Sequence, residues 1–215
     1  MKWLKALFGG GDTATATRSL NHPDQIRAGD IIQFKYMDLV ETSGKTFEVS
    51  QVNTYIYGDI CYPELVLKDR EGLLLYAMVE DEDGDEYLTL SKKISKGDIQ
   101  TVLSPEALQA LQDQGLGYAA SANVLPDLSA WMQSQYKTVD KLKGAFVKGD
   151  ARELSEAEFR KRDYFTSYLL ETPDEEFALE LEVYASGELE LCATRYFDLT
   201  EIEYMWPAKS TQVTP

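Results

Sequence analysis

The sequence predicts a mainly β protein of the α+β type, with two small antiparallel β-barrel or bent-sheet units joined by short helices. Three observations lead to this fold class. Short segments rich in β-branched and aromatic residues are separated by turn residues over residues 22–102. Helical signals replace them over residues 103–162, and a clean two-residue alternation begins at residue 163.

The composition indicates a globular protein with strong negative charge. The chain has 215 residues, 44% of them hydrophobic, which is ample for a packed core. Its 37 acidic residues against 21 basic ones give a formal net charge of −16. This field repels phosphate backbones, so we expect no nucleic-acid partner. No apolar run approaches the ~18 residues of a spanning helix, and the first apolar stretch is too short for a secretory signal. We therefore expect a cytoplasmic protein.

Residues 1–21 are predicted to form an amphipathic segment followed by a flexible linker. Apolar residues recur there at helical spacing with lysines on the other face, and three glycines end the pattern. The residues expected to dock this segment to a membrane or to a protein partner are Lys2, Trp3, Leu4, Lys5, Leu7 and Phe8. A helix this short gains too little from such burial to act alone, so the docking needs a second contact.

Residues 22–102 are predicted to form the first β-domain. Residues such as Phe34, Phe47 and Val49 favour strands, and turn signals recur at short intervals, among them "AGD", "TSGK", "DREG" and "EDEDGDE". This spacing is typical of a small antiparallel barrel or a strongly bent sheet of five or six strands.

Residues 103–162 are predicted to be a helical connector. Ser104 and Pro105 begin a helix that ends at Gly115, and a second helix is expected after Pro126, with Trp131 on its apolar side. Ser155 and Glu158 have the spacing of a capping box, which predicts a third short helix.

Residues 163–207 are predicted to form a second β-sheet unit, followed by a frayed tail over residues 208–215. In "EEFALELEVYASGELELCATRY" leucines alternate with glutamates on both sides of a glycine turn. One face is expected to be buried. The other face carries most of the carboxylates, which we expect to point to water and to keep ordinary pKa values.

Several stretches of the first β-domain resemble a known family. The stretches "GDIIQF", "KTFEVSQVNTYIYG", "ELVLKDREG" and "AMVEDEDGDEYLTL" are similar to those of the YjfK-like family of uncharacterised bacterial cytoplasmic proteins. The resemblance covers roughly residues 26–95. It implies a β-fold and an accessory role near a membrane-stress or polyamine-related system, and it supplies no catalytic residues.

The sequence argues against the common catalytic and metal sites. His22 is the only histidine and lies in a turn, which disfavours imidazole-dependent catalysis. Cys61 and Cys192 are far apart in sequence, so two reduced thiols are expected rather than a metal site. In the acidic loop around Gly84, the register of an EF-hand places Val79 and Leu90 where ligands are needed. We expect no metal and no cofactor.

Three functions remain as hypotheses. The first is a non-enzymatic cytoplasmic interaction protein, with peripheral contact at the inner membrane, that docks through the N-terminal segment. The second is an acidic binding module for a small cation or polyamine, carried by Glu180, Glu182, Glu188 and Glu190. The third is a carboxylate-dependent enzyme, which requires two converging acids in a cleft. The oligomeric state is left open.

Overall fold

The structure is a computed structural model that describes residues 18–82 and 84–208. Its strands form one antiparallel sheet in the order β11-β1-β2-β3-β4-β5-β10-β9-β8-β7-β6. The first five strands are β1 (Ile31–Phe34), β2 (Thr46–Tyr57), β3 (Ile60–Lys68), β4 (Leu74–Glu82) and β5 (Asp85–Lys93). The others are β6 (Ala119–Ser121), β7 (Gln135–Val147), β8 (Asp163–Glu171), β9 (Phe177–Tyr184), β10 (Leu189–Asp198) and β11 (Ile202–Trp206).

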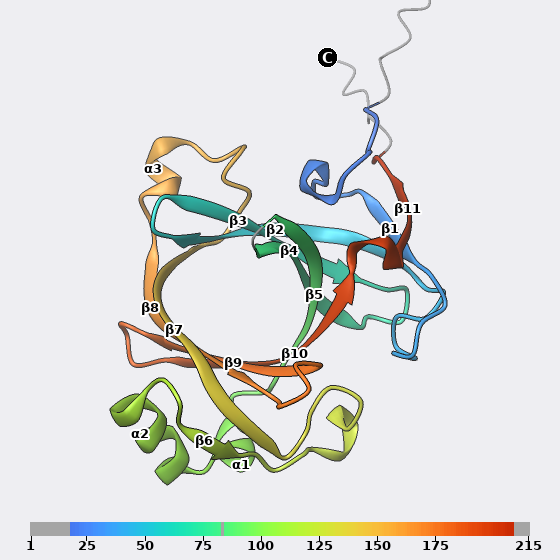
Figure 1. Cartoon of the computed structure of the whole chain (residues 1–215). Coiled ribbons are helices and arrows are strands. Elements are labelled where there is room, and N and C mark those ends of the chain that lie inside the picture. The colour runs from blue at the N-terminus through green and yellow to red at the C-terminus, as the bar shows by residue number, and fades with distance from the viewer. Residues whose placement is uncertain (1–17, 83, 209–215) are drawn as a thin grey trace, which may run out of the picture.

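An additional pairing closes eight of these strands into a ring. β2 continues past its pairing with β1 and joins β7 over residues 54–57, so that β2, β3, β4, β5, β10, β9, β8 and β7 form a closed antiparallel barrel. Figure 1 shows this ring, with β1 and β11 on one side and β6 below it. The prediction of a mainly β fold is confirmed. Strands of the two predicted units join in this ring, because β5 pairs with β10, and the ring also includes β7, which lies in the predicted connector and pairs with β2.

The two halves, β1–β5 and β6–β10, have the same topology. Each begins with a short strand and continues through four strands of the ring. The halves meet at two strand pairs, which we call seams. At the seam between β5 and β10, Ser91 pairs with Thr194 and Lys93 pairs with Cys192. If Ser91 corresponds to Cys192 and Lys93 to Thr194, exchanging the halves converts one pair into the other.

The seam between β2 and β7 shows the same correspondence. There Tyr55 pairs with Phe146 and Tyr57 pairs with Gly144. Each long first strand also has a bulge, after Val49 in β2 and after Thr138 in β7. The register therefore relates the halves by an approximate two-fold rotation across the ring.

The main apolar core lies outside the ring. One face of each ring strand contributes fully buried leucines, for example Leu67, Leu90, Leu179 and Leu191. Residues of the connecting segments cover this face and belong to the same cluster, including Trp131. The covering helices are α1 (Ile99–Val102), α2 (Pro105–Gln114) and the 3-10 turn η2 (Pro126–Leu128), and two more 3-10 turns are η1 (Pro23–Gln25) and η3 (Leu199–Glu201).

The capping signals in the connector predicted two helices correctly. Ser104 caps α2, whose last residue precedes Gly115 at φ 67°, and Ser155 and Glu158 form the predicted capping box of α3 (Glu156–Phe159). These two predictions are confirmed because caps act locally on the backbone.

Two predictions for residues 103–162 are wrong. The expected helix after Pro126 is only the turn η2, and residues 135–147 form the long strand β7 inside the supposed connector. The outward side chains of β7 include the exposed Lys141 and Lys143, so the strand lacks an apolar alternation. The bulge after Thr138 shifts that alternation further.

Candidate functional site

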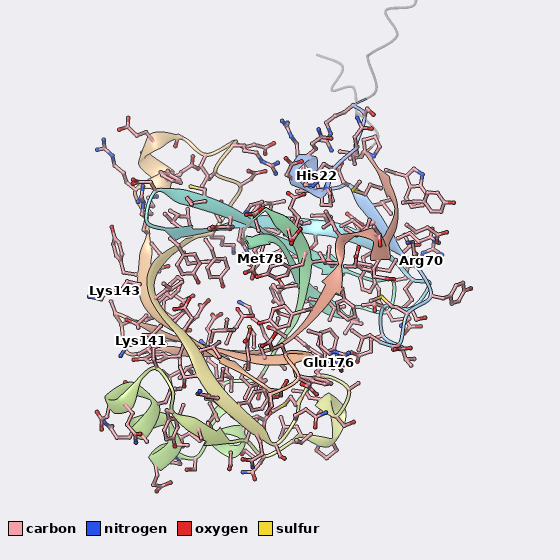
Figure 2. All side chains as sticks on the ribbon, in the orientation of Figure 1. His22, Arg70, Met78, Lys141, Lys143 and Glu176 are labelled. Carbon is pink, nitrogen blue, oxygen red and sulfur yellow. The ribbon has the colours of Figure 1, made fainter. Side chains whose placement is uncertain are left out.

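The inner face of the ring is polar. Residues that pair directly across two strands share a face, so the registers fix which side chains point inward. The hydroxyl of Tyr55 on β2 reaches Glu182 on β9, although β7 and β8 lie between these strands. Such a contact must cross the interior. Figure 2 shows side chains filling the ring, with Met78 of β4 inside it.

Carboxylates dominate this inner face between its two rims. Six glutamates on β3, β4, β8, β9 and β10 lie on this face, and Asp140 of β7 shares it; the glutamates are Glu64, Glu80, Glu171, Glu180, Glu182 and Glu190. The exposed Lys68 and Lys137 lie towards the ends of this face, and the cation among the glutamates further inside is Lys93. Its ammonium lies 2.7 Å from Glu190 and 4.7 Å from the ring centroid of Tyr76. The interior therefore has a large excess of negative charge when its glutamates are ionised.

Aromatic rings line the same interior. The inward-facing tyrosines are Tyr55, Tyr57, Tyr62, Tyr76, Tyr87, Tyr184 and Tyr196. Tyr55 packs edge to face on Phe146 and Phe165, with ring centroids 5.2 Å and 5.8 Å apart. Burial raises the pKa of Tyr55, Tyr57 and Tyr184, so these phenols stay neutral and donate hydrogen bonds.

Hydroxyl and amide groups hold the carboxylates in place. Tyr184 donates to Glu182 at 2.6 Å, Thr194 donates to Glu180 at 2.6 Å, and Asn53 donates to Glu64 at 2.7 Å. Tyr196 donates to Glu171 at 2.9 Å across the intervening strand β9. Each carboxylate mentioned thus keeps acceptor capacity for a further donor, since a carboxylate offers about four lone-pair sites.

The enclosure perturbs the acidity of these groups. Burial raises the pKa of Glu180 to about 8, and the nearby charges of Glu80 and Glu182 act in the same direction. Burial also raises the pKa of Glu182 to about 7, against the hydrogen bonds from Tyr184 and Tyr55. Burial alone would lower the pKa of Lys93, but the charges of Glu64 and Glu190 raise it. The interior consequently loses protons near neutral pH, when Glu182 and Glu180 ionise.

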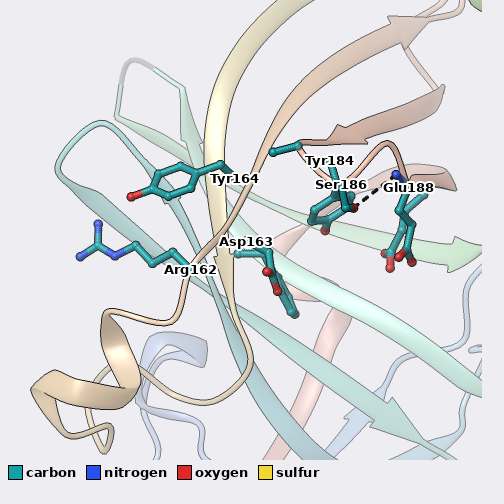
Figure 3. Close-up of a pocket in the computed structure, with 9 residues that line it drawn as sticks. Arg162, Asp163, Tyr164, Tyr184, Ser186 and Glu188 are labelled. Carbon is teal, nitrogen blue, oxygen red and sulfur yellow. Dashed lines mark hydrogen bonds between the residues drawn. The ribbon is translucent and has the colours of Figure 1, made fainter.

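A pocket of about 480 Å³ opens at one end of the ring. Its inner wall includes Phe146, Tyr184 and Glu190, which belong to the inner face. Its rim, shown in Figure 3, includes Arg162, Asp163, Tyr164, Ser186 and Glu188. This volume lies within the range of ~300–1,000 Å³ that is usual for small-molecule sites. The pocket, which we call the mouth, leads to Tyr184 and thus to Glu182.

The structure brings together three of the four predicted cation-binding residues. Glu180, Glu182 and Glu190 face the interior, whereas Glu188 lies at the mouth and forms an exposed ion pair with Lys96. The expectation that these glutamates face water with ordinary pKa values is wrong for Glu180 and Glu182. The alternation was identified correctly, but closure of the ring turns the carboxylate face inward.

The other candidate residues are scattered. Lys2, Trp3, Leu4, Lys5, Leu7 and Phe8 lie outside the described residues, so docking through them stays a prediction. His22 contacts Asp24 and Glu86 near the N-terminus of the described chain. Cys61 is exposed, while Cys192 faces the interior. Within residues 18–82 and 84–208, no three His, Cys, Asp or Glu side chains are grouped to hold a metal ion.

Sequence reasoning missed three of the inner glutamates. Glu64, Glu80 and Glu171 were not singled out, although Asn53, Tyr55 and Tyr57 already show a polar and aromatic alternation along β2. That alternation indicates a strand face that carries polar and aromatic side chains. Its meaning depends on the closure between β2 and β7, which no local pattern shows.

Comparisons with family models, with curated proteins and with solved structures returned no match. The resemblance to the YjfK-like family therefore stays a prediction. In the described part of the chain, no helix is both long enough and apolar enough to cross a membrane.

Proposed function

We propose that the protein is a non-enzymatic binding protein for a small, multiply charged amine, held inside the ring and admitted through the mouth. The observation that supports this most directly is the inner face itself, where glutamates surround Lys93 in an aromatic-lined interior. Ammonium groups pair with carboxylates and stack on aromatic faces, so an oligoamine matches both features.

The distribution of the carboxylates favours an extended ligand over a single ion. Glu190 lies at the mouth, Glu182 lies behind Tyr184, and Glu180 is one step further along β9. An oligoamine carries positive charges at intervals along an aliphatic chain. One ligand can therefore meet several of these carboxylates in turn, while its methylene groups pack against the tyrosine rings.

The raised pKa values give the proposal a specific pH dependence. A cation binds the ionised carboxylates and therefore displaces protons from Glu182 and Glu180. Affinity should rise between pH 6 and pH 9 as these groups ionise, and binding at pH 7 should release protons. A surface of ordinary glutamates would show neither effect, because it is fully ionised throughout this range.

Isothermal titration calorimetry with spermidine tests the proposal. We expect saturable binding to the full chain at moderate salt, and a heat at pH 7 that changes with the ionisation enthalpy of the buffer. Glu182→Gln should weaken binding about tenfold or more. Glu176→Gln, which changes an exposed glutamate at the start of the same hairpin (Figure 2), should leave binding unchanged.

Three results would contradict the proposal. The first is the absence of heat at millimolar spermidine. The second is equal weakening by Glu182→Gln and Glu176→Gln, which would indicate nonspecific attraction to an acidic surface. The third is equal binding of spermidine and of 1,8-octanediol, which has no charge, because this would remove the role of the carboxylates.

A carboxylate-dependent enzyme is the second candidate, and one observation favours it. Glu180, with a pKa raised to about 8, lies near enough to Glu80 to be affected by its charge. A protonated acid beside a second carboxyl is an arrangement used for general acid catalysis at neutral pH. Hydrolysis of chromogenic glycosides that disappears in Glu180→Gln would support this candidate. Equal rates in the two proteins would remove it.

A further inference from the structure

A second surface of the molecule is apolar and faces outward. Tyr204 and Trp206 on β11 stack with their ring centroids 5.4 Å apart, and they are 53% and 42% exposed. Ile31 on β1 pairs with Trp206 and is 36% exposed, so the three side chains share one face. Ile202 and Met205 pack against the main core from the same strand. We call Ile31, Tyr204 and Trp206 the β11 strip.

The β11 strip lies at an edge of the sheet. β11 is the first strand in the sheet order and pairs only with β1. Its other edge has no strand partner among the described residues. Large aromatic side chains on an uncovered edge are uncommon in a protein that stays monomeric, because such edges invite pairing with other chains.

The described part of the chain begins at Arg18, close to this strip. Asp30, which is fully buried and directly precedes Ile31, forms an ion pair with Arg18 and accepts a hydrogen bond from the backbone of Ala208 at 2.8 Å. Ala208 follows Trp206 by two residues. The point at which residue 17 joins Arg18 is therefore next to the β11 strip, and Figure 1 shows both ends of the described chain on this side.

The length of the preceding chain lets its apolar residues reach the strip. Nine residues separate Phe8 from Arg18, and nine residues span at most about 30 Å when fully extended. Trp3, Leu4, Leu7 and Phe8 provide apolar side chains at helical spacing. Attachment through so short a connection gives an effective concentration in the millimolar range, which favours the same chain over a second copy or a membrane.

We propose that residues 3–8 dock on the β11 strip of their own chain and cover Tyr204 and Trp206. In this arrangement β11 competes with a partner or a membrane for the predicted amphipathic segment. A partner or a membrane surface gains access to Trp3 and Phe8 only by displacing the contact with β11. The proposal is independent of ligand binding in the ring, since the strip and the mouth share no residues.

Paramagnetic broadening in NMR spectra tests this contact. The full chain would carry Cys61→Ser and Cys192→Ser, with a nitroxide attached after Ala6→Cys. The oxidised label should broaden the indole signal of Trp206 at least twofold relative to the reduced label. The amide signal of Lys143, which Figure 2 places on the far side of the ring from β11, should be unaffected.

A mixed sample separates the same chain from a second copy. Isotope-labelled protein without nitroxide is combined with nitroxide-labelled protein without isotope, and no broadening is expected. Broadening of the Trp206 signal in the mixed sample would overturn the proposal in favour of a dimer, because the nitroxide there belongs to another copy of the chain. Equal Trp206 signals with oxidised and reduced label would overturn it outright. Leu4→Ser with Leu7→Ser should abolish the broadening, and persistence in that variant would show that the apolar side chains are not responsible.

Discussion

The two halves of the ring have the same topology but carry different chemistry on their inner faces. On the outer face, matched positions are alike, as Leu75 corresponds to Leu179 and Leu90 corresponds to Leu191, all of them fully buried. On the inner face, Tyr76 corresponds to Glu180. The comparison shows that matched outer positions carry the same buried apolar side chains, whereas matched inner positions differ in charge and hydrogen-bonding capacity.

The largest expected effect tests whether the outer faces are equivalent. Leu75→Ala and Leu179→Ala each remove a fully buried side chain from the main core. Each should lower the free energy of unfolding by about 3 kcal/mol, within the ~2–5 kcal/mol usual for such changes. Urea denaturation of both variants measures this. If either variant lowers the free energy of unfolding by less than about 1 kcal/mol, the outer faces of the two halves do not contribute equally to stability.

The seam between β2 and β7 offers a second test. Gly144 occupies the place that corresponds to Tyr55, and a Cβ there would lie 2.6 Å from Phe165 and 2.8 Å from Tyr57. Both contacts involve aromatic rings packed among other rings, which cannot move freely. Gly144→Ala should therefore cost about 1–3 kcal/mol of stability. An unchanged melting temperature would mean that this aromatic cluster adapts more readily than its packing indicates.

The inner faces should differ in their pH dependence. The pKa of Glu180 is raised from 4.5 to about 8, so the native state holds its proton more tightly than the unfolded state. This contribution to stability is present below pH 4.5 and is lost as the pH rises through about 8. Between these limits the contribution of Glu180 to the free energy of unfolding should fall by on the order of 1 kcal/mol per pH unit.

Glu180→Gln should remove the part of the slope that Glu180 contributes, on the order of 1 kcal/mol per pH unit, and leave the part that Glu182 contributes below about pH 7. Tyr76→Phe at the matched position should keep the whole slope. Urea denaturation at several pH values between 5 and 8 measures both slopes. If Glu180→Gln retains the slope of the wild type, the inner carboxyl is ionised throughout the range, and the pH argument for ligand binding falls with it.

The smallest effect concerns a contact without a counterpart in the second half. His22 contacts Glu86 of β5 at 3.0 Å, and hydrogen bonds with Asp24 and Glu86 raise its pKa above 6.5 against the effect of burial. The contribution of His22 to stability is fully present below pH 6.5 and is lost as the pH rises through the raised pKa of this histidine. His22→Asn should therefore destabilise the protein at pH 6 by less than about 1 kcal/mol and have no effect at pH 8.5. Thermal unfolding at the two pH values checks this, and an equal effect at both would exclude an ionic origin.

Local signals in the sequence determined several features of this protein. Ser104 and the Ser155–Glu158 pair predicted helix starts, since a cap depends only on its neighbours in the chain. The alternation of leucine and glutamate over residues 177–184 predicted a strand with one apolar face and one charged face. The mainly β class followed from such patterns.

The tertiary structure alone decided which way the charged face points. Alternation along β9 is the same whether its glutamates meet water or an enclosed interior, because the period of a strand is two in either case. Closure requires Tyr55 to pair with Phe146, which lies in a segment predicted to be helical. That long-range pairing turned a predicted solvent face into an interior with raised pKa values, and no stretch of neighbouring residues encodes it.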